Sequence, residues 1–159
     1  MTQRIHPDPI KMKDAWQAML GLKAAVLKST LEHSLIKLIK VRVSQINGCG
    51  YCIDMHTKEA RAAGETEQRL YLLDAWREAV PSMYSSRERA ALAWAEAVTR
   101  LERQNVEDAV FEQVQREFTE AELVALTLCV VEINSWNRFA ISFRFAAGSY
   151  QPDSFAKTS

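Results

Sequence analysis

The stretch NGCGYCIDMH, residues 47–56, follows a segment with helical spacing of apolar residues and holds two of the three cysteines. Gly48, which comes after an asparagine, tolerates the left-handed backbone conformation that ends helices, so it predicts a helix stop. Cys49 and Cys52 are three positions apart, and His56 is four positions beyond the second cysteine. If a helix opens at this point, both sulfurs and the imidazole lie on one face of it.

That arrangement has a definite chemistry. At a helix start, free backbone N–H groups and the helix dipole stabilise a thiolate, so the pKa of Cys49 is expected below the free value of about 8.5. Cys52 lies within reach for a disulfide, and His56 beside it can take the thiol proton or pair with the thiolate as a cation. The motif therefore indicates a dithiol reaction centre with a nucleophile, a base and a resolving thiol.

Other interpretations of the motif stay open. A zinc site would need a fourth ligand from His33, His6 or Cys129, and none of these has a familiar spacing. Covalent haem attachment needs the histidine directly after the second cysteine, and here three residues intervene. A thioredoxin-like fold needs strands around the motif, and only IKVRVS, residues 39–44, alternates like a strand. Two cysteines without chemistry are a further alternative, and Cys129, in apolar surroundings, is interpreted as a buried structural thiol.

The composition bounds the class of protein. A chain of 159 residues fits one domain, expected to span residues 1–159 with a core of about 30–145, a flexible N-terminal arm and a flexible C-terminal tail. Twenty basic and twenty acidic side chains interleave to a net charge of zero, so neither nucleic acid nor a membrane is an expected partner. No apolar run approaches the ~18 residues that cross a bilayer. With no secretory signal and too few cysteines for a disulfide scaffold, a cytoplasmic location is expected.

Helix-forming residues dominate the chain and glycine is scarce, which predicts an all-α bundle of six to seven helices. Thr66 can cap one helix, and Ser85 with Glu88 and Thr119 with Glu122 have capping-box spacing at two more. The last helix is apolar nearly all round in its first half, so it is expected in the centre of the molecule or at a subunit contact. The expected helices cover residues 13–28, 31–47, 49–64, 67–79, 86–101, 106–116 and 121–145.

The sequence SQINGCGYCIDMHTKEARAAGET, residues 44–66, resembles the core of the alkylhydroperoxidase AhpD-like branch of the carboxymuconolactone decarboxylase superfamily. The likeness extends to SSRERAALAWAEAVTRL and TEAELVALTLCVVEINSWNRFAISFR, and it covers about residues 30–145. The resemblance implies an all-helical fold that assembles as homo-oligomers, either trimers or hexamers. No cofactor and no metal is expected.

The resemblance also implies an activity, the thiol-dependent reduction of a small hydroperoxide in antioxidant defence. Cys52 would attack the peroxide with the help of His56, and Cys49 would resolve the resulting sulfenic acid as a disulfide. An external dithiol or lipoyl-type electron donor would then reduce the pair. Two alternatives are a redox-responsive oligomeric binding protein without fast turnover and a carboxymuconolactone decarboxylase-like enzyme.

One position departs from the family pattern, which has a glutamate twelve residues before the first cysteine. This chain has Lys37 there, and a lysine is a poor proton relay unless it is desolvated. Glu96 is the preferred substitute for the relay, and Glu32 and Asp54 are weaker candidates. Glu96 can equally form an ordinary surface ion pair with Arg100, four positions on.

A second stretch, NSWNRF at residues 134–139, has two interpretations. Trp136 and Phe139 could line the pocket beside the dithiol, with Asn134 and Asn137 ordering it. Packing of these side chains between subunits is the preferred interpretation, because tryptophan and arginine are enriched at interfaces.

Overall fold

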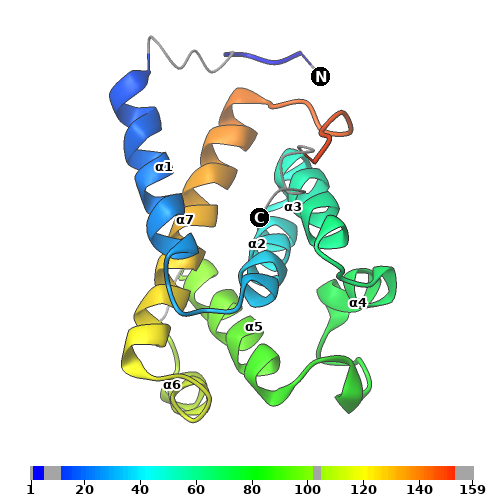
Figure 1. The fold of residues 1–159 in the computed structure, drawn as a ribbon, viewed down its shortest axis with the longest axis vertical. Helices are drawn as coiled ribbons and strands as arrows, with labels where there is room; N and C mark the ends of the chain where they lie inside the picture. The colour runs from blue at the N-terminus through cyan, green and yellow to red at the C-terminus, as the bar shows by residue number, and fades with distance from the viewer. Residues whose placement is uncertain (1, 6–11, 102–104, 153–159) are drawn as a thin grey trace.

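The computed structural model describes residues 2–5, 12–101 and 105–152 and shows an all-α fold (Figure 1). Within these residues there is no β-strand, so the predicted fold class is confirmed and IKVRVS, residues 39–44, is helical. The elements are α1 (Lys13–Leu27), α2 (His33–Asn47), α3 (Gly50–Ala62), α4 (Glu67–Leu72), η1 (Leu73–Ala75), η2 (Pro81–Met83), α5 (Ser86–Thr99), α6 (Asp108–Gln115) and α7 (Glu120–Phe143).

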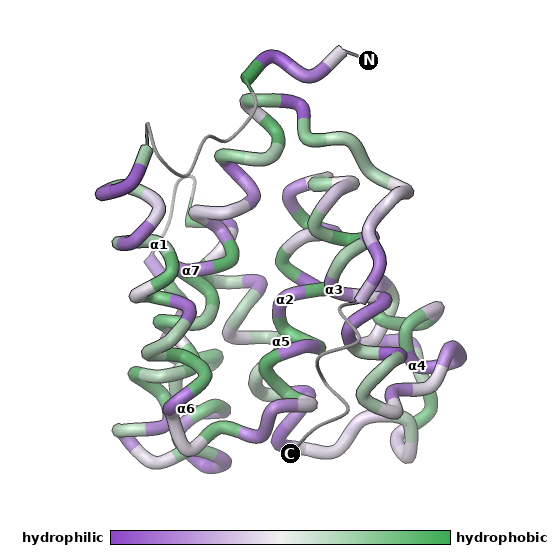
Figure 2. Tube along the Cα trace, turned by 45° about the horizontal axis from the view of Figure 1, so that its top comes forward, coloured by the Kyte–Doolittle hydropathy of each residue, from purple (hydrophilic) through white to green (hydrophobic). Residues whose placement is uncertain are grey.

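The centre of the bundle is α2, which packs against α3, α5 and α7. α1 lies along α7, and α6 packs against α5 and α7 (Figure 1). Of the ten positions 35–44 of α2, nine are buried and only Lys37 is not, and the buried ones include the charged residues Lys40 and Arg42. Figure 2 accordingly shows hydrophilic segments within α2 although it lies inside the bundle. A helix in this position needs partners for its buried charges, and neighbouring helices supply them.

The predicted helix starts are confirmed by their capping hydrogen bonds. Ser85 and Thr119 each accept a bond from the backbone N–H three residues on, and Glu88 and Glu122 return a bond to the backbone N–H of the cap. The Thr66 hydroxyl accepts from the third residue of its own helix in the same way. These bonds satisfy N–H groups that a helix start leaves without a partner, so the capping residues determine where three helices begin.

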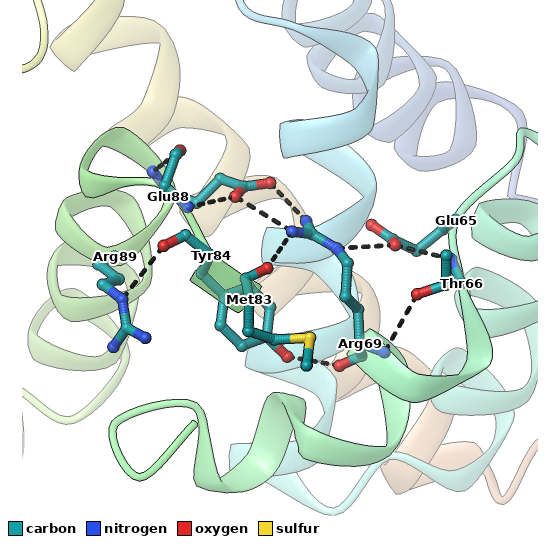
Figure 3. Close-up of polar contacts among 8 residues, drawn as sticks. Glu65, Thr66, Arg69, Met83, Tyr84, Glu88 and Arg89 are labelled. Carbon is teal, nitrogen blue, oxygen red and sulfur yellow. Dashed lines mark hydrogen bonds and ion pairs between the residues drawn. The ribbon is translucent and has the colours of Figure 1, made fainter. Parts of the chain in front are cut away.

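The predicted helix over residues 67–79 is shorter in the structure, because α4 ends at Leu72 and continues as the short 3-10 helix η1. After η1, the guanidinium of Arg89 in α5 donates to the carbonyl oxygens of Trp76, Ala79 and Val80. These bonds attach the segment that follows α4 and η1 to α5. Figure 3 shows the neighbouring contact, in which Arg69 of α4 binds Glu88 of α5 at 2.5 Å and also the carbonyl of residue 83.

Residues after α7 return across the bundle to α3. The backbone N–H of Gly148 donates to Asp54 at 2.9 Å, and Lys58 donates to the carbonyl of Tyr150 at 2.7 Å. The Tyr150 hydroxyl donates to Glu59 at 2.9 Å. The tail up to residue 152 is thus attached to the helix that carries His56, while residues 153–159 lie outside the described residues. No helix among the described residues is both long and apolar enough to cross a membrane.

Candidate active site

The two motif cysteines lie at the junction of α2 and α3. Gly48 follows α2 with a φ of 68°, the left-handed conformation that the sequence predicts for a helix stop. Cys49 is the N-cap of α3, and Cys52 lies in the first turn of that helix. Their sulfur atoms are 2.6 Å apart, both are free thiols, and both residues are 1% exposed. The predicted dithiol is therefore formed by one helix start and enclosed by the bundle.

The two sulfurs share one negative charge near neutral pH. The thiol of Cys52 donates to the sulfur of Cys49, which lowers the pKa of Cys49 to about 7 against the opposing effect of burial. The same hydrogen bond and burial raise the pKa of Cys52, because ionising it would remove the donor and place two charges side by side. The resting charge therefore lies on Cys49, stabilised by the thiol proton of Cys52.

A buried amide also serves the thiol pair. Asn137 of α7 is fully buried and acts as a hydrogen-bond donor that lowers the pKa of both cysteines. Its own amide oxygen accepts from Asn47 at 2.8 Å, and its nitrogen donates to Ser44 at 3.1 Å. Asn137 is thus held in place by α2 beside the thiols, while its role in ordering the pocket stays a prediction.

His56 is buried in the second turn of α3, and its Nδ1 lies 2.9 Å from a carboxylate oxygen of Glu59. Burial alone would raise the pKa of Glu59, but hydrogen bonds from His56 and Tyr150 lower it to about 2, so this group is a carboxylate. A carboxylate only accepts, and therefore Nδ1 carries the proton. Burial lowers the pKa of His56. A neutral imidazole with its proton on Nδ1 leaves Nε2 as a free base.

The predicted contact between His56 and Cys52 is only partly reproduced. Within the described residues, no hydrogen bond joins the imidazole to either sulfur. With 100° between successive residues of a helix, Cys52 lies between Met55 and His56 around α3. Met55, His56 and Tyr51 line one cavity. Cys52 is therefore on the side of α3 that faces this cavity, with His56 next to it.

That cavity, which we call the inner chamber, has a volume of about 180 Å³. Its aromatic walls are Trp16, Tyr51, Trp136 and Phe145, and Trp16 meets Trp136 edge to face at a centroid distance of 5.1 Å. Trp136 thus lines the pocket, which was the less favoured of its two interpretations. Phe139 packs instead against Phe143, with ring centroids 5.8 Å apart.

A second, wider cavity of about 490 Å³ adjoins the inner chamber, and we call it the outer vestibule. Lys23, Lys40 and His56 line both cavities, so they form the boundary between them. The vestibule is further lined by Lys37 and Glu59, and by the described end of the tail. Together the two cavities give His56 a polar side and an aromatic side.

Two charged residues of this site were not found from the sequence. Lys40 of α2 and Glu132 of α7 form a buried ion pair at 2.8 Å, and both line the inner chamber. The charge of Glu132 raises the pKa of Cys52, and the charge of Lys40 lowers that of His56. A single acidic residue in the apolar run ALTLCVVEI was the available signal, because an ionised group in such a helix needs a partner.

Glu96, the preferred relay acid, is placed elsewhere. It is buried in α5, where its carboxylate accepts from Arg42 and Trp76, both at 2.8 Å, and from Arg77. Burial would raise its pKa, but these hydrogen bonds lower it. None of its hydrogen-bond or ion-pair partners among the described residues belongs to the cysteine and histidine group. The structure therefore assigns Glu96 contacts that join α5 to α2, and a relay role for it stays a prediction.

The weaker candidates also have structural partners, since Glu32 pairs with Arg87 and Asp54 with Lys58. Cys129 is fully buried in α7, and burial raises its pKa to about 12, as suits a structural thiol. Among the described residues, no three histidine, cysteine or acidic side chains gather as metal ligands. His6, one of the possible fourth ligands of a zinc site, lies outside the described residues.

The chain is similar in sequence to known proteins. Residues 11–97 match the model of the Carboxymuconolactone decarboxylase family. The chain is 40% identical over 149 residues to the uncharacterized protein YdfG of Bacillus subtilis (strain 168), which covers 94% of this chain and 99% of that protein.

Two solved structures are similar as well. A protein of unknown function from Agrobacterium tumefaciens, ATU0492, described as a putative antioxidant defence protein AhpD, superposes with a TM-score of 0.87 at 39% identity. The match covers 94% of this chain and all of that one. An uncharacterized peroxidase-related protein with an AhpD core from Ralstonia eutropha JMP134 shares the fold, with a TM-score of 0.73 at 22% identity over 89% of this chain and 74% of the other. The chain therefore belongs to the carboxymuconolactone decarboxylase family, as an AhpD-like member.

Proposed function

We propose that the protein is a dithiol peroxidase that reduces small organic hydroperoxides through Cys49 and Cys52. The observation that carries the proposal is the pair of free sulfurs 2.6 Å apart at the start of α3, with one pKa lowered to about 7. Such a pair offers a thiolate at neutral pH and a second thiol close enough to trap an oxidised partner. Similarity to AhpD-like proteins supports the same assignment.

In the first step a thiolate attacks the terminal oxygen of the hydroperoxide. The O–O bond breaks, the sulfur becomes a sulfenic acid, and the alkoxide leaves and takes a proton to become an alcohol. Attack is assigned to Cys52, because around α3 it lies between Met55 and His56, which both line the inner chamber. The short separation of the sulfurs lets the shared proton pass to Cys49 and the charge to Cys52.

In the second step Cys49 attacks the sulfur of the Cys52 sulfenic acid. A disulfide forms and water leaves, so the two electrons that reduced the peroxide have come from the two thiols. An external dithiol then restores the pair by thiol–disulfide exchange and is itself oxidised to a disulfide. The site needs no displacement of helices between these states, because both sulfurs belong to one helix start.

His56 is assigned the proton transfers. With Nδ1 bonded to Glu59, Nε2 is free to accept a proton from the thiol pair and return it to the leaving alkoxide. The neutral form required for this role is the one that burial favours. Replacing His56 by alanine is expected to lower kcat/KM for the peroxide roughly 10²-fold, the usual contribution of a general acid–base group.

The test is a titration of the fully reduced protein with an organic hydroperoxide while its thiols are counted. We expect rapid loss of two thiols per chain and formation of one alcohol per peroxide, and repeated turnover once a dithiol reductant is added. Cys129→Ala serves as the matched control, since it removes a thiol that the mechanism does not use. Cys52→Ser should abolish turnover.

Three results would contradict the proposal. Turnover that survives Cys52→Ser would mean that the activity does not depend on the dithiol, as for a lactone decarboxylase. Thiol oxidation that is stoichiometric and slow, with a change in sedimentation, would instead indicate a redox-responsive binding protein. Loss of activity in the Cys129→Ala control would show that the two motif cysteines are not sufficient.

A further inference from the structure

The outer vestibule is lined by more lysines than acidic residues. Three lysines, Lys23, Lys37 and Lys40, line it together with one acid, Glu59. Lys40 is paired with Glu132 at 2.8 Å, and Glu59 accepts hydrogen bonds from His56 and Tyr150. Counting the lysines against these two glutamates leaves one positive charge in excess across the two cavities.

Lys37 is the residue to which this excess is best assigned. It is half-buried and lines both the vestibule and a smaller pocket that holds Glu65 and Glu88, and within the described part of the chain it has no ion-pair partner. Lys23 is exposed, and its charge contributes to lowering the pKa of Glu59. An ammonium group in a concave wall without a counterion attracts small anions, because the surrounding low-dielectric walls concentrate its field.

The inner chamber has the opposite character. Its walls are chiefly aromatic and apolar, and its volume of about 180 Å³ accepts a small organic group rather than a long chain. Because Lys23, Lys40 and His56 line both cavities, a ligand with its apolar part in the chamber extends toward the vestibule and Lys37. The pair of cavities thus fits an amphipathic molecule with one anionic end.

We propose that the substrate is a small apolar hydroperoxide that carries a carboxylate, with the carboxylate bound at Lys37 and the apolar part in the inner chamber. This inference rests on the proposed peroxidase function. A carboxylate is favoured over a phosphate monoester because a single excess positive charge matches a monoanion. The apolar contacts and the lysine together orient the hydroperoxide group toward Cys52, on the side of α3 between Met55 and His56.

The first experiment measures binding alone and does not depend on turnover. Phenylacetate and its uncharged counterpart phenylacetamide are titrated into the reduced protein, and binding is followed by tryptophan fluorescence and by calorimetry, since Trp16 and Trp136 line the chamber. We expect phenylacetate to bind roughly tenfold more tightly than the amide, as for one charge-assisted contact. Lys37→Gln should remove this preference, and Lys28→Gln, an exposed lysine outside both cavities, should keep it.

The second experiment compares kcat/KM for a carboxylate-bearing aryl-alkyl hydroperoxide and for its methyl ester. The acid should be preferred roughly tenfold, mainly through KM, and the preference should disappear in Lys37→Gln and weaken at high salt. If phenylacetate and the amide bind equally, or if Lys37→Gln changes neither binding nor the preference for the acid, the inference is wrong. Reduction of both the acid and the ester would in that case still support the peroxidase function. If neither hydroperoxide is reduced, the proposed peroxidase function is wrong, and the carboxylate-bearing hydroperoxide is then not a substrate either.

Discussion

At the scale of single residues, the dithiol differs from two ordinary thiols because one S–H group stabilises the other sulfur as an anion. Cys49 has its pKa lowered from 9.0 to about 7, so its thiolate persists as the pH falls from 9 and is lost below about 7. Burial alone would raise the pKa of both cysteines, so in Cys49 it opposes the hydrogen bond. The donor bond from Cys52 is therefore the contact that makes the pair reactive at neutral pH.

This gives a prediction about pH. Ultraviolet absorbance of the reduced protein should show one thiolate forming with a midpoint near pH 7, and Cys129→Ala should leave that midpoint unchanged. Cys52→Ala removes the donor, so the midpoint of Cys49 should rise toward 9.0. A midpoint that stays near 7 in Cys52→Ala would mean that the helix start alone stabilises the anion.

A second prediction concerns the order of the two roles. In Cys49→Ser the resolving thiol is absent, so one equivalent of hydroperoxide should leave a sulfenic acid on Cys52. A dimedone-type probe followed by peptide mass spectrometry detects it, and Cys129→Ala, which keeps both thiols, should give a disulfide instead. If the probe labels Cys49 in Cys52→Ser and finds nothing on Cys52 in Cys49→Ser, the roles are reversed.

The sequence predicted the local part of the site and missed the part that depends on the fold. Cys49, Cys52 and His56 are separated by three and four positions, so helical geometry alone brings them together. Lys40 and Glu132 meet only because α2 packs on α7, and no local pattern records that contact. Glu96 shows the same limit, since its partners Arg42 and Arg77 come from other segments of the chain.

At the scale of elements, helix starts were predicted well because a cap is a short-range feature. The two capping boxes need residues only three positions apart, and both form as the sequence indicates. The end of α4 was not predicted, and the segment that follows it bonds to Arg89, which lies in a different helix. Short-range signals therefore predicted where these helices begin, whereas the contacts of the segment after α4 are long-range.

The capping box of α7 allows a prediction about stability. Thr119→Ala removes the hydroxyl that accepts from the backbone N–H of Glu122, and it should lower the free energy of unfolding in urea by about 1 kcal/mol. Thr119→Ser keeps an acceptor and should lose much less. The folded pKa of Glu122 is lowered from 4.5 to about 2, chiefly by its bond to the backbone of Thr119, so its contribution should fade as the pH falls from 4.5 toward 2. An unchanged urea midpoint in Thr119→Ala would show that the cap is not needed.

At the scale of the whole molecule, the bundle is held at its centre by charges as well as by apolar packing. Lys40 and Glu132 join α2 to α7, while Arg42 and Glu96 join α2 to α5 at 2.7 Å. A buried ion pair gains little net stability, because both charges lose their hydration. Lys40 and Glu132 also line the chamber beside His56, so we expect them to contribute to the site as well.

Removal of one member of this pair should therefore cost more than removal of both. Lys40→Met leaves Glu132 buried without its counterion, and the free energy of unfolding should fall by about 3–5 kcal/mol. The double variant with Glu132→Leu should recover much of that loss, and the coupling follows from a double-mutant cycle by urea unfolding. Additive effects of the two substitutions would mean that the two groups do not interact.

Assembly into trimers or hexamers stays a prediction of the family resemblance. One surface that such an assembly could cover is an apolar hollow of about 880 Å³ between α6 and α7. Phe111, Val124 and Val131 are exposed in its lining, with Val124 at 70%. Covering these side chains with another copy would remove apolar surface from water.

The placement of both sulfurs at the start of α3 has a consequence for how much oxidation changes the stability of the fold. Closing a covalent loop between residues three apart removes little freedom from the unfolded chain, about 2 kcal/mol by the chain-entropy model, against more than twice that for a link across the whole domain. The melting temperature should consequently be about 4–8 °C higher in the oxidised form, at about 2–4 °C per kcal/mol for a chain of this size. Each redox cycle therefore changes the stability of the fold by less than half of what a disulfide across the whole domain would.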